Sequence, residues 1–291
     1  MVKKLSALYA EARRAIATQE DPDTAGWVAR ELLSHVTGKS RESLLTDMEN
    51  YAGDDVSEAL EQSLSRYLSG EPMAYILGKW DFYGMTLHVD PNVLIPRDDT
   101  CAVTELALQA AQRLDGSPRI LDLCTGSGCI GLALAHKLPG AKVTLADISK
   151  ETLTVAKKNV TEQKLSARVS CVTADALAGP TAFLGKFDLI VSNPPYITTG
   201  EMQELPDSVK NYEPHLALHG GDDGLDFYRA IAEKYQKALK PGGFLCFEFG
   251  MGQGDDVCKI LDQYGYIILD RTKDYNDRER AVLAQFGRKE A

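Results

Sequence analysis

From about residue 98 onward, apolar runs of strand length alternate with amphipathic stretches of helix length, such as 149–164 and 225–239. The apolar runs lie at 119–124, 142–147, 168–174, 187–192 and 244–249. This alternation predicts a mainly parallel sheet that helices cover on both faces. Only a polar loop separates the last two apolar runs, 266–270 and 280–286, so we expect them to form an antiparallel hairpin at the sheet edge.

Residues 1–75 have a different pattern, which is helical throughout. Val28, Leu32 and Val36, for example, recur every four residues and mark one face of a helix. In residues 76–96 the period changes to two on both sides of a glycine, which is typical of a hairpin. The sequence therefore predicts three parts: a helical domain at 1–75, a β-hairpin linker at 76–96 and an α/β domain at 97–291.

The charge and the cysteines narrow the possible functions. The 291 residues include 32 basic and 42 acidic side chains, and a net charge of -10 argues against non-specific nucleic-acid binding. The six cysteines form no C-x-x-C pair and no ligand-spaced cluster with the five histidines, so we expect no metal site. We find neither a signal peptide nor an apolar stretch long enough to span a bilayer, and we expect a cytoplasmic protein. Because no exposed apolar stripe is left unassigned, we expect a monomer.

Residues 120–135, "ILDLCTGSGCIGLALA", read as a strand, a glycine turn and a helix. Gly126, Gly128 and Gly131 satisfy G-x-G-x-x-G, the dinucleotide-binding fingerprint. Glycines let a ligand approach the backbone closely, and the start of the following helix offers free N–H groups. The fingerprint alone does not choose between NAD and another cofactor that carries a nucleoside.

Acidic residues at three consecutive strand ends distinguish the two cofactors. Asp122 precedes the turn, where it would repel a pyrophosphate but can hold a cationic amino-acid group through water or backbone. Asp147 is placed to accept the ribose hydroxyls, and Asp175 to accept the adenine amine. S-adenosylmethionine carries all three groups, whereas a dinucleotide would leave Asp175 unused. The alternative for each aspartate taken alone is that it caps the following helix.

The fourth strand ends in "FDLIVSNPPYI", residues 187–197. Pro194 and Pro195 fix φ and remove two backbone donors, so the Asn193 side-chain carbonyl and the Pro194 backbone carbonyl remain as acceptors. Two acceptors suit a substrate –NH2, while a carboxylate would set acceptor against acceptor. Tyr196 adds a planar face for an amide or a base. The segment predicts methyl transfer to an amide or an exocyclic amine; a plain strand-ending turn would explain the prolines alone.

With these motifs the chain resembles the release-factor glutamine methyltransferases (the HemK-type family). The resemblance rests on the segments 71–84 (EPMAYILGKWDFYG), 95–100 (IPRDDT), 191–197 (VSNPPYI) and 212–229 (YEPHLALHGGDDGLDFYR). It implies a class I S-adenosylmethionine-dependent methyltransferase fold: a Rossmann-like, doubly wound α/β sheet with an antiparallel C-terminal hairpin, plus a small N-terminal helical bundle. It also implies methylation of the glutamine in the Gly-Gly-Gln motif of peptide chain release factors, with S-adenosylhomocysteine as product and the helical domain docking the factor.

The resemblance assigns roles to individual residues. The substrate-holding residues are Asn193, Pro194, Pro195 and Tyr196, with Arg97 in a loop at the mouth of the site. The cofactor-binding residues are Cys124, Thr125, Gly126, Ser127, Gly128, Asp147, Asp175, Ala176 and Asn193. Two positions depart from the family pattern: Cys124 stands where the family usually has Gly, and Asp98-Asp99 where it usually has Pro-Glu. We expect Asp98 or Asp99 to cap the helix that begins there.

Four other functions predict different features. A ribosomal-protein glutamine methyltransferase shares N-P-P-Y, and only the segment at 71–84 and the long helical domain favour release factors. A nucleic-acid adenine-N6 methyltransferase predicts a basic strip, which the acidic balance disfavours. A catalytically silent scaffold predicts a degraded N-P-P-Y, and a dehydrogenase predicts an acid–base residue beside the glycine turn.

Overall fold

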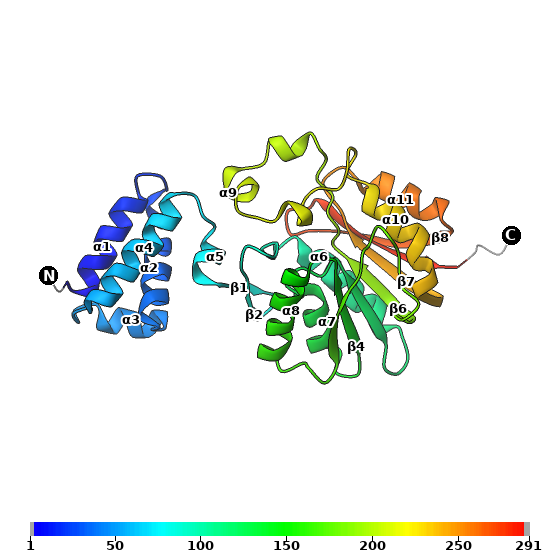
Figure 1. Ribbon diagram of the computed structural model, residues 1–291, viewed down its shortest axis with the longest axis horizontal. Coiled ribbons are helices and arrows are strands. Elements are labelled where there is room, and N and C mark those ends of the chain that lie inside the picture. Colours follow the sequence, from blue (N-terminus) through cyan, green and yellow to red (C-terminus); the bar gives the residue numbers. More distant parts are fainter. Residues whose placement is uncertain (1–2, 288–291) are drawn as a thin grey trace. The chain divides into compact units, whose positions relative to one another are not determined.

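The computed structural model describes residues 3–287, and the chain folds into two compact units (Figure 1). The first unit ends at Gly78 and also contains Asp207–Tyr212. The second unit comprises Lys79–Pro206 and continues from Glu213. The chain therefore leaves the second unit after Pro206 and returns to it at Glu213, an excursion that the sequence pattern did not predict.

The first unit is a helical bundle. Its helices are α1 (Leu5–Ile16), α2 (Pro22–Thr37), α3 (Arg41–Asp47), α4 (Asp54–Leu68), α5 (Met73–Leu77) and the short α9 (Asp207–Lys210). In α2, Asp21 caps the first turn and Val28 and Leu32 are buried in the core, as their spacing predicts. The Tyr212 hydroxyl donates to the Ser69 carbonyl at 2.9 Å, which ties the 207–212 excursion to this bundle.

The second unit contains a hairpin and a large sheet. The hairpin strands are β1 (Lys79–Phe82) and β2 (Met85–His88). The sheet strands are β3 (Arg119–Leu123), β4 (Lys142–Asp147), β5 (Val169–Thr173), β6 (Phe187–Ser192), β7 (Leu239–Glu248), β8 (Tyr266–Lys273) and β9 (Glu279–Phe286). Their order is β5-β4-β3-β6-β7-β9-β8, parallel from β5 to β7 and antiparallel through β9 and β8. The predicted doubly wound sheet with an antiparallel C-terminal hairpin is confirmed.

Helices cover both faces of this sheet (Figure 1). On one face lie α6 (Thr100–Gln112), α7 (Cys129–Lys137) and α8 (Lys150–Glu162), and on the other lie α10 (Asp226–Lys234) and α11 (Gly254–Gln263). Single 3₁₀ turns occupy Glu201–Gln203, His215–Ala217 and Tyr235–Ala238. Each face has its own apolar core, and strand residues alternate between the two cores as a sheet buried on both faces requires.

The strand order reverses between β3 and β6. From β3 the chain proceeds outward to β4 and β5, and then returns to the other side of β3 to build β6 and β7. In such sheets ligands bind beyond the carboxyl ends of the strands at this switch point. The glycine turn follows β3 and the N-P-P-Y segment follows β6, so both predicted motifs lie at the switch point. Within residues 3–287, no helix has both the length and the apolar character needed to cross a membrane.

Candidate active site

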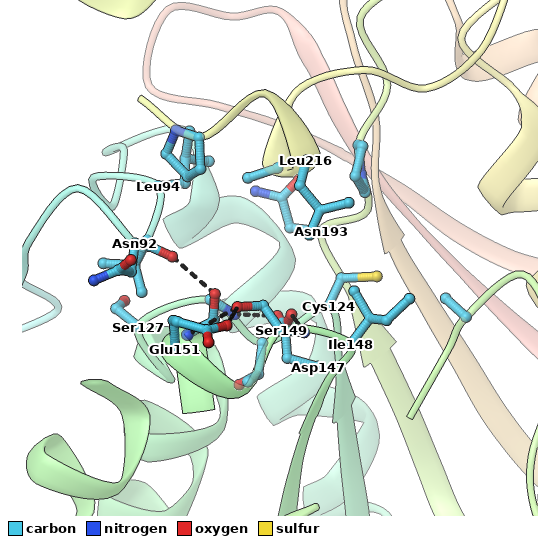
Figure 2. A pocket seen from close by; sticks show the side chains of 18 of the residues that line it. Asn92, Leu94, Cys124, Ser127, Asp147, Ile148, Ser149, Glu151, Asn193 and Leu216 are labelled. Carbon is cyan, nitrogen blue, oxygen red and sulfur yellow. Dashed lines mark hydrogen bonds between the residues drawn. The ribbon is translucent and has the colours of Figure 1, made fainter. Parts of the chain in front are cut away.

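A cavity of about 300 Å³ opens at the switch point, and its walls come from strand ends and loops of the second unit. Figure 2 shows Asn193 and Leu216 together on one side, with Asp147, Ser149 and Glu151 across from them. Of the predicted residues, the cavity is lined by Cys124, Thr125, Gly126, Ser127, Asp147, Asp175, Ala176, Asn193 and Pro195. The remaining predicted residues, Gly128, Pro194, Tyr196 and Arg97, do not line it.

The glycine turn depends on left-handed backbone. Cys124, Gly126 and Gly128 have φ values of 60°, 55° and 87°. A side chain on Gly126 would meet nothing within 4 Å, which shows that the backbone there faces open space. Gly131 serves packing instead, because a Cβ there would lie 2.3 Å from the Leu145 side chain. Cys124 takes a conformation that favours glycine, the residue expected at this position from the resemblance.

Asp122 lies beneath the turn and does not line the cavity. Its side chain is fully buried, and Oδ2 accepts from the Thr125 hydroxyl at 2.7 Å and from the Gly131 N–H at 2.9 Å. Burial raises the pKa of Asp122 to about 7. We expected this carboxylate to hold a cationic ligand group through water or backbone. Because its contacts are to the turn and it does not line the cavity, it can act on a ligand only through the backbone of the turn that it supports.

Asp147 and Asp175 line the cavity at the ends of β4 and β5. The Asp147 carboxylate accepts from the Gly126 N–H and the Ser149 N–H, both at 3.1 Å, so it fixes the turn from across the sheet. Burial raises the pKa of Asp147. The cap of α8 is Ser149, which excludes the simple capping alternative for Asp147. Asp175 does cap a turn, since its Oδ1 accepts from the N–H groups of Leu177 and of the next residue.

The sequence pattern missed a second wall of the cavity. It comes from the loop 91–94, from Ser149 and Glu151 at the start of α8, and from the loop 214–217. The Thr152 hydroxyl donates to the Asn92 carbonyl at 2.8 Å and holds the first loop against α8. The available signal was weak, because an Asp-Pro-Asn turn after a strand is common and the contact joins residues far apart in the chain.

The end of β6 is pinned to its neighbours. The Ser192 hydroxyl donates to the Leu123 carbonyl at 2.6 Å, and the Asn193 Nδ2 donates to the Thr100 Oγ1 at 3.3 Å. Tyr196 packs against the core under α10 and α11, and its carbonyl accepts from the Gln253 amide at 3.0 Å. Burial raises the pKa of Tyr196. The phenol is therefore held in the wall behind the motif.

The 95–100 segment is held by two ion pairs. Arg97 pairs with Glu213, a buried carboxylate that also accepts from the Ile95 N–H at 3.2 Å. Asp99 forms an ion pair with Arg280 at 3.0 Å and makes no capping hydrogen bond at the start of α6. We expected Asp98 or Asp99 to cap this helix; Asp99 stands at the N-cap position and does not do so, because the buried guanidinium is the stronger partner for its carboxylate.

Comparisons with known proteins agree with this architecture. The Methyltransferase small domain family model matches residues 87–209, and the PrmC N-terminal domain model matches residues 7–78. A solved methyltransferase from Pyrococcus furiosus has a TM-score of 0.51 and 19% identity, over 78% of this chain and 99% of that chain. At this identity the likeness concerns the fold alone. Fold, site and family model together define a methyltransferase.

Two relatives identify the family. The release factor glutamine methyltransferase of Clostridium acetobutylicum is 40% identical over 88% of this chain and 90% of that protein. The release factor glutamine methyltransferase of Chlorobaculum tepidum is 42% identical over 87% of this chain and 88% of that protein. The chain belongs to the release factor glutamine methyltransferase family, so the resemblance found in the sequence is confirmed.

Proposed function

We propose that this enzyme methylates the glutamine side-chain amide in the Gly-Gly-Gln motif of a peptide chain release factor, with S-adenosylmethionine as donor. The observation that carries the proposal is the position of Asn193 in the cavity wall, across from Asp147 (Figure 2). The names of the relatives support the same acceptor protein. We further propose that the enzyme acts as a cytoplasmic monomer and that its helical unit docks the factor.

The described residues fit S-adenosylmethionine. The backbone at Gly126 faces open space, where a ligand can approach the turn closely, while the Gly126 N–H itself donates to Asp147. Asp147 lines the cavity where ribose hydroxyls would find an acceptor, and Asp175 and Ala176 line it where an adenine would lie. Cys124 through Ser127, which line the cavity, would hold the amino-acid end through backbone groups. When bound, S-adenosylmethionine supplies a methyl group on a positively charged sulfur.

The residues after β6 suit a primary amide. An amide nitrogen is a poor nucleophile because its lone pair is delocalised over the carbonyl. Hydrogen bonds from its two N–H groups to the Asn193 Oδ1 and the Pro194 carbonyl would hold the nitrogen in place and favour a pyramidal geometry. Positioning of this kind contributes up to about 7–11 kcal/mol in favourable cases. A carboxylate at the same place would leave acceptors facing each other, at about 1–3 kcal/mol for each unsatisfied group.

The proposal is tested with S-adenosylmethionine that carries a labelled methyl group. The acceptors are a purified release factor, its Gln→Glu and Gln→Ala variants at the Gly-Gly-Gln motif, a ribosomal-protein mixture and DNA. We expect label only in the wild-type factor. Label in the factor variants, or in ribosomal proteins or DNA in preference to the factor, would overturn the proposal.

The role of Asn193 is tested separately. We expect Asn193→Ala to lower kcat by at least about a hundredfold, in line with the loss of one positioned hydrogen-bonding group at a reaction centre. Cofactor affinity, measured by calorimetry, should change little, because the carboxylates on the opposite wall remain. Loss of cofactor affinity with unchanged kcat would make Asn193 a cofactor ligand instead.

A further inference from the structure

Two buried polar side chains lie behind Asn193. Thr100, the first residue of α6, is 2% exposed, and Glu248, the last residue of β7, is 1% exposed. The Asn193 Nδ2 donates to the Thr100 Oγ1 at 3.3 Å, and the Glu248 carboxyl lies beside both side chains, which act to lower its pKa. Strand register explains the proximity, because Ser192 of β6 pairs with Phe247 of β7.

The chemistry of these groups sets the direction of each hydrogen bond. An ionised Glu248 can only accept, so it favours an arrangement in which the Thr100 hydroxyl hydrogen and the Asn193 –NH2 face it. The Thr100 hydroxyl hydrogen then points toward the carboxylate, and the Thr100 oxygen accepts from the Asn193 Nδ2. Both neighbours therefore require the nitrogen end of the Asn193 amide, and the oxygen end is left for the cavity.

The reverse orientation of the amide is unfavourable. It would set the Asn193 oxygen against the Glu248 carboxylate and against a hydroxyl whose hydrogen that carboxylate attracts. It would also present –NH2 to the cavity, and that group would bind a carboxylate better than an amide nitrogen. The identity of the groups behind Asn193 thus decides which substrate group the site accepts.

Burying the Glu248 carboxyl in this part of the core is unfavourable for folding. Burial raises its pKa to about 7, although the neighbouring Thr100 and Asn193 side chains and the charge of Arg280 favour the ionised form. Its Oε2 has no hydrogen-bond partner within residues 3–287. A buried carboxyl with an unsatisfied oxygen is unfavourable for folding, which indicates that it serves the site.

We propose that Thr100 and Glu248 are positioning residues that fix the Asn193 amide with its oxygen toward the cavity and so make the site select an amide over a carboxylate. This inference rests on the proposed function for the identity of the substrate amide. The orientation of Asn193 itself can be measured without any substrate.

The first test compares Thr100→Val, which keeps the shape but removes the hydroxyl, with Thr100→Ser, which keeps the hydroxyl. Binding of the wild-type release factor and of its Gln→Glu variant is measured with S-adenosylhomocysteine present, at about pH 8, where Glu248 is ionised. We expect the preference for glutamine over glutamate to fall about tenfold in Thr100→Val and to be retained in Thr100→Ser. Glu248→Gln supplies a donor as well as an acceptor, and it should also weaken the preference.

Kinetics separate positioning from a structural role. In Thr100→Val we expect kcat to fall about tenfold or more while the calorimetric cofactor affinity stays within about twofold, and we expect Thr100→Ser to restore kcat. An unchanged glutamine preference in both Thr100→Val and Glu248→Gln, with the fold intact by circular dichroism, would overturn the inference.

The second test needs no variant to fold and no acceptor protein. In nitrogen-15 spectra of the wild-type chain, the two Asn193 side-chain N–H protons should exchange with water at least about tenfold more slowly than those of the exposed Asn276. Equal exchange rates would overturn the anchoring of Asn193. Slow exchange without methylation of any release factor would instead support the anchoring and overturn the proposed function.

Discussion

The two sides of the cavity hold their functional groups in different ways. On the side of β3, β4 and β5, carboxylates accept from backbone N–H groups: Asp147 from Gly126, 21 positions away, and Asp175 from Leu177, two positions away. On the side of β6, β7 and β9, side chains hold other side chains, as in the bond from Asn193 to Thr100, 93 positions away. The first side shapes loops, and the second side orients a single amide.

The difference shows how each side tolerates change. A turn that is held by several backbone bonds keeps its shape when one side chain changes, because the remaining bonds persist. A network of buried charged side chains has no remaining bonds that compensate, since removal of one partner leaves another charge unpaired in the interior. Arg280 lies at the centre of the side-chain network on the side of β6, β7 and β9. It is 6% exposed, pairs with Asp99 and Asp274, and donates to the Phe249 carbonyl.

The largest expected effect therefore comes from the side-chain network. Arg280→Met keeps the length of the side chain but leaves Asp274 and Asp99 without their cation, and we expect a loss of about 3–5 kcal/mol in the free energy of unfolding. The matched control is Arg271→Met, because Arg271 also pairs with two carboxylates but those are exposed. There we expect a loss of no more than about 1 kcal/mol. Equal losses of unfolding free energy in the two variants, measured in urea, would contradict the distinction between the buried ion pairs of Arg280 and the exposed ion pairs of Arg271.

A smaller effect that depends on pH is expected at Asp122. Burial raises its pKa from 3.8 to about 7, so the folded protein keeps a proton that the unfolded chain releases above about pH 4. Its contribution to stability is therefore complete below about pH 4 and is lost as pH rises through 7, by up to about 1.4 kcal/mol per pH unit.

Asp122→Asn removes this titration and keeps a carbonyl oxygen for the bonds from Thr125 and Gly131. We expect the variant to gain stability relative to the wild type as pH rises from about 4 to 7. Urea unfolding at several pH values measures the difference. A difference that does not vary with pH would show that the carboxyl is not protonated in the folded protein.

The smallest effect is expected at Cys124, whose left-handed φ of 60° is unfavourable for a residue with a side chain. Cys124→Gly relieves this strain but adds backbone entropy to the unfolded chain, and we expect a net gain of up to about 1 kcal/mol. Cys124→Ala keeps the strain and loses packing of the thiol, so we expect no gain. Thermal unfolding of the two variants distinguishes backbone strain from packing of the thiol. A larger gain in stability in Cys124→Ala than in Cys124→Gly would contradict the strain explanation.

Much of the fold and of the first side of the site could be predicted from the sequence. Alternating apolar runs predicted the sheet and its C-terminal hairpin, and the glycine turn and the strand-end residues Asp147 and Asp175 were predicted to lie together. These features follow from local rules: backbone hydrogen bonding, residue periodicity and the shared carboxyl edge of parallel strands. Asn193 was found by the same reasoning, from its place after a buried strand.

Only the tertiary structure decided the partners of these residues. It placed Asp122 beneath the turn, paired Asp99 with Arg280, and brought Thr100 and Glu248 behind Asn193. The physical reason is that a side chain bonds to whatever the packing of distant segments brings within about 3 Å, and no local pattern records that packing. The sequence by itself determined that an asparagine stands at the end of β6, and the tertiary structure decided which end of its amide faces the cavity.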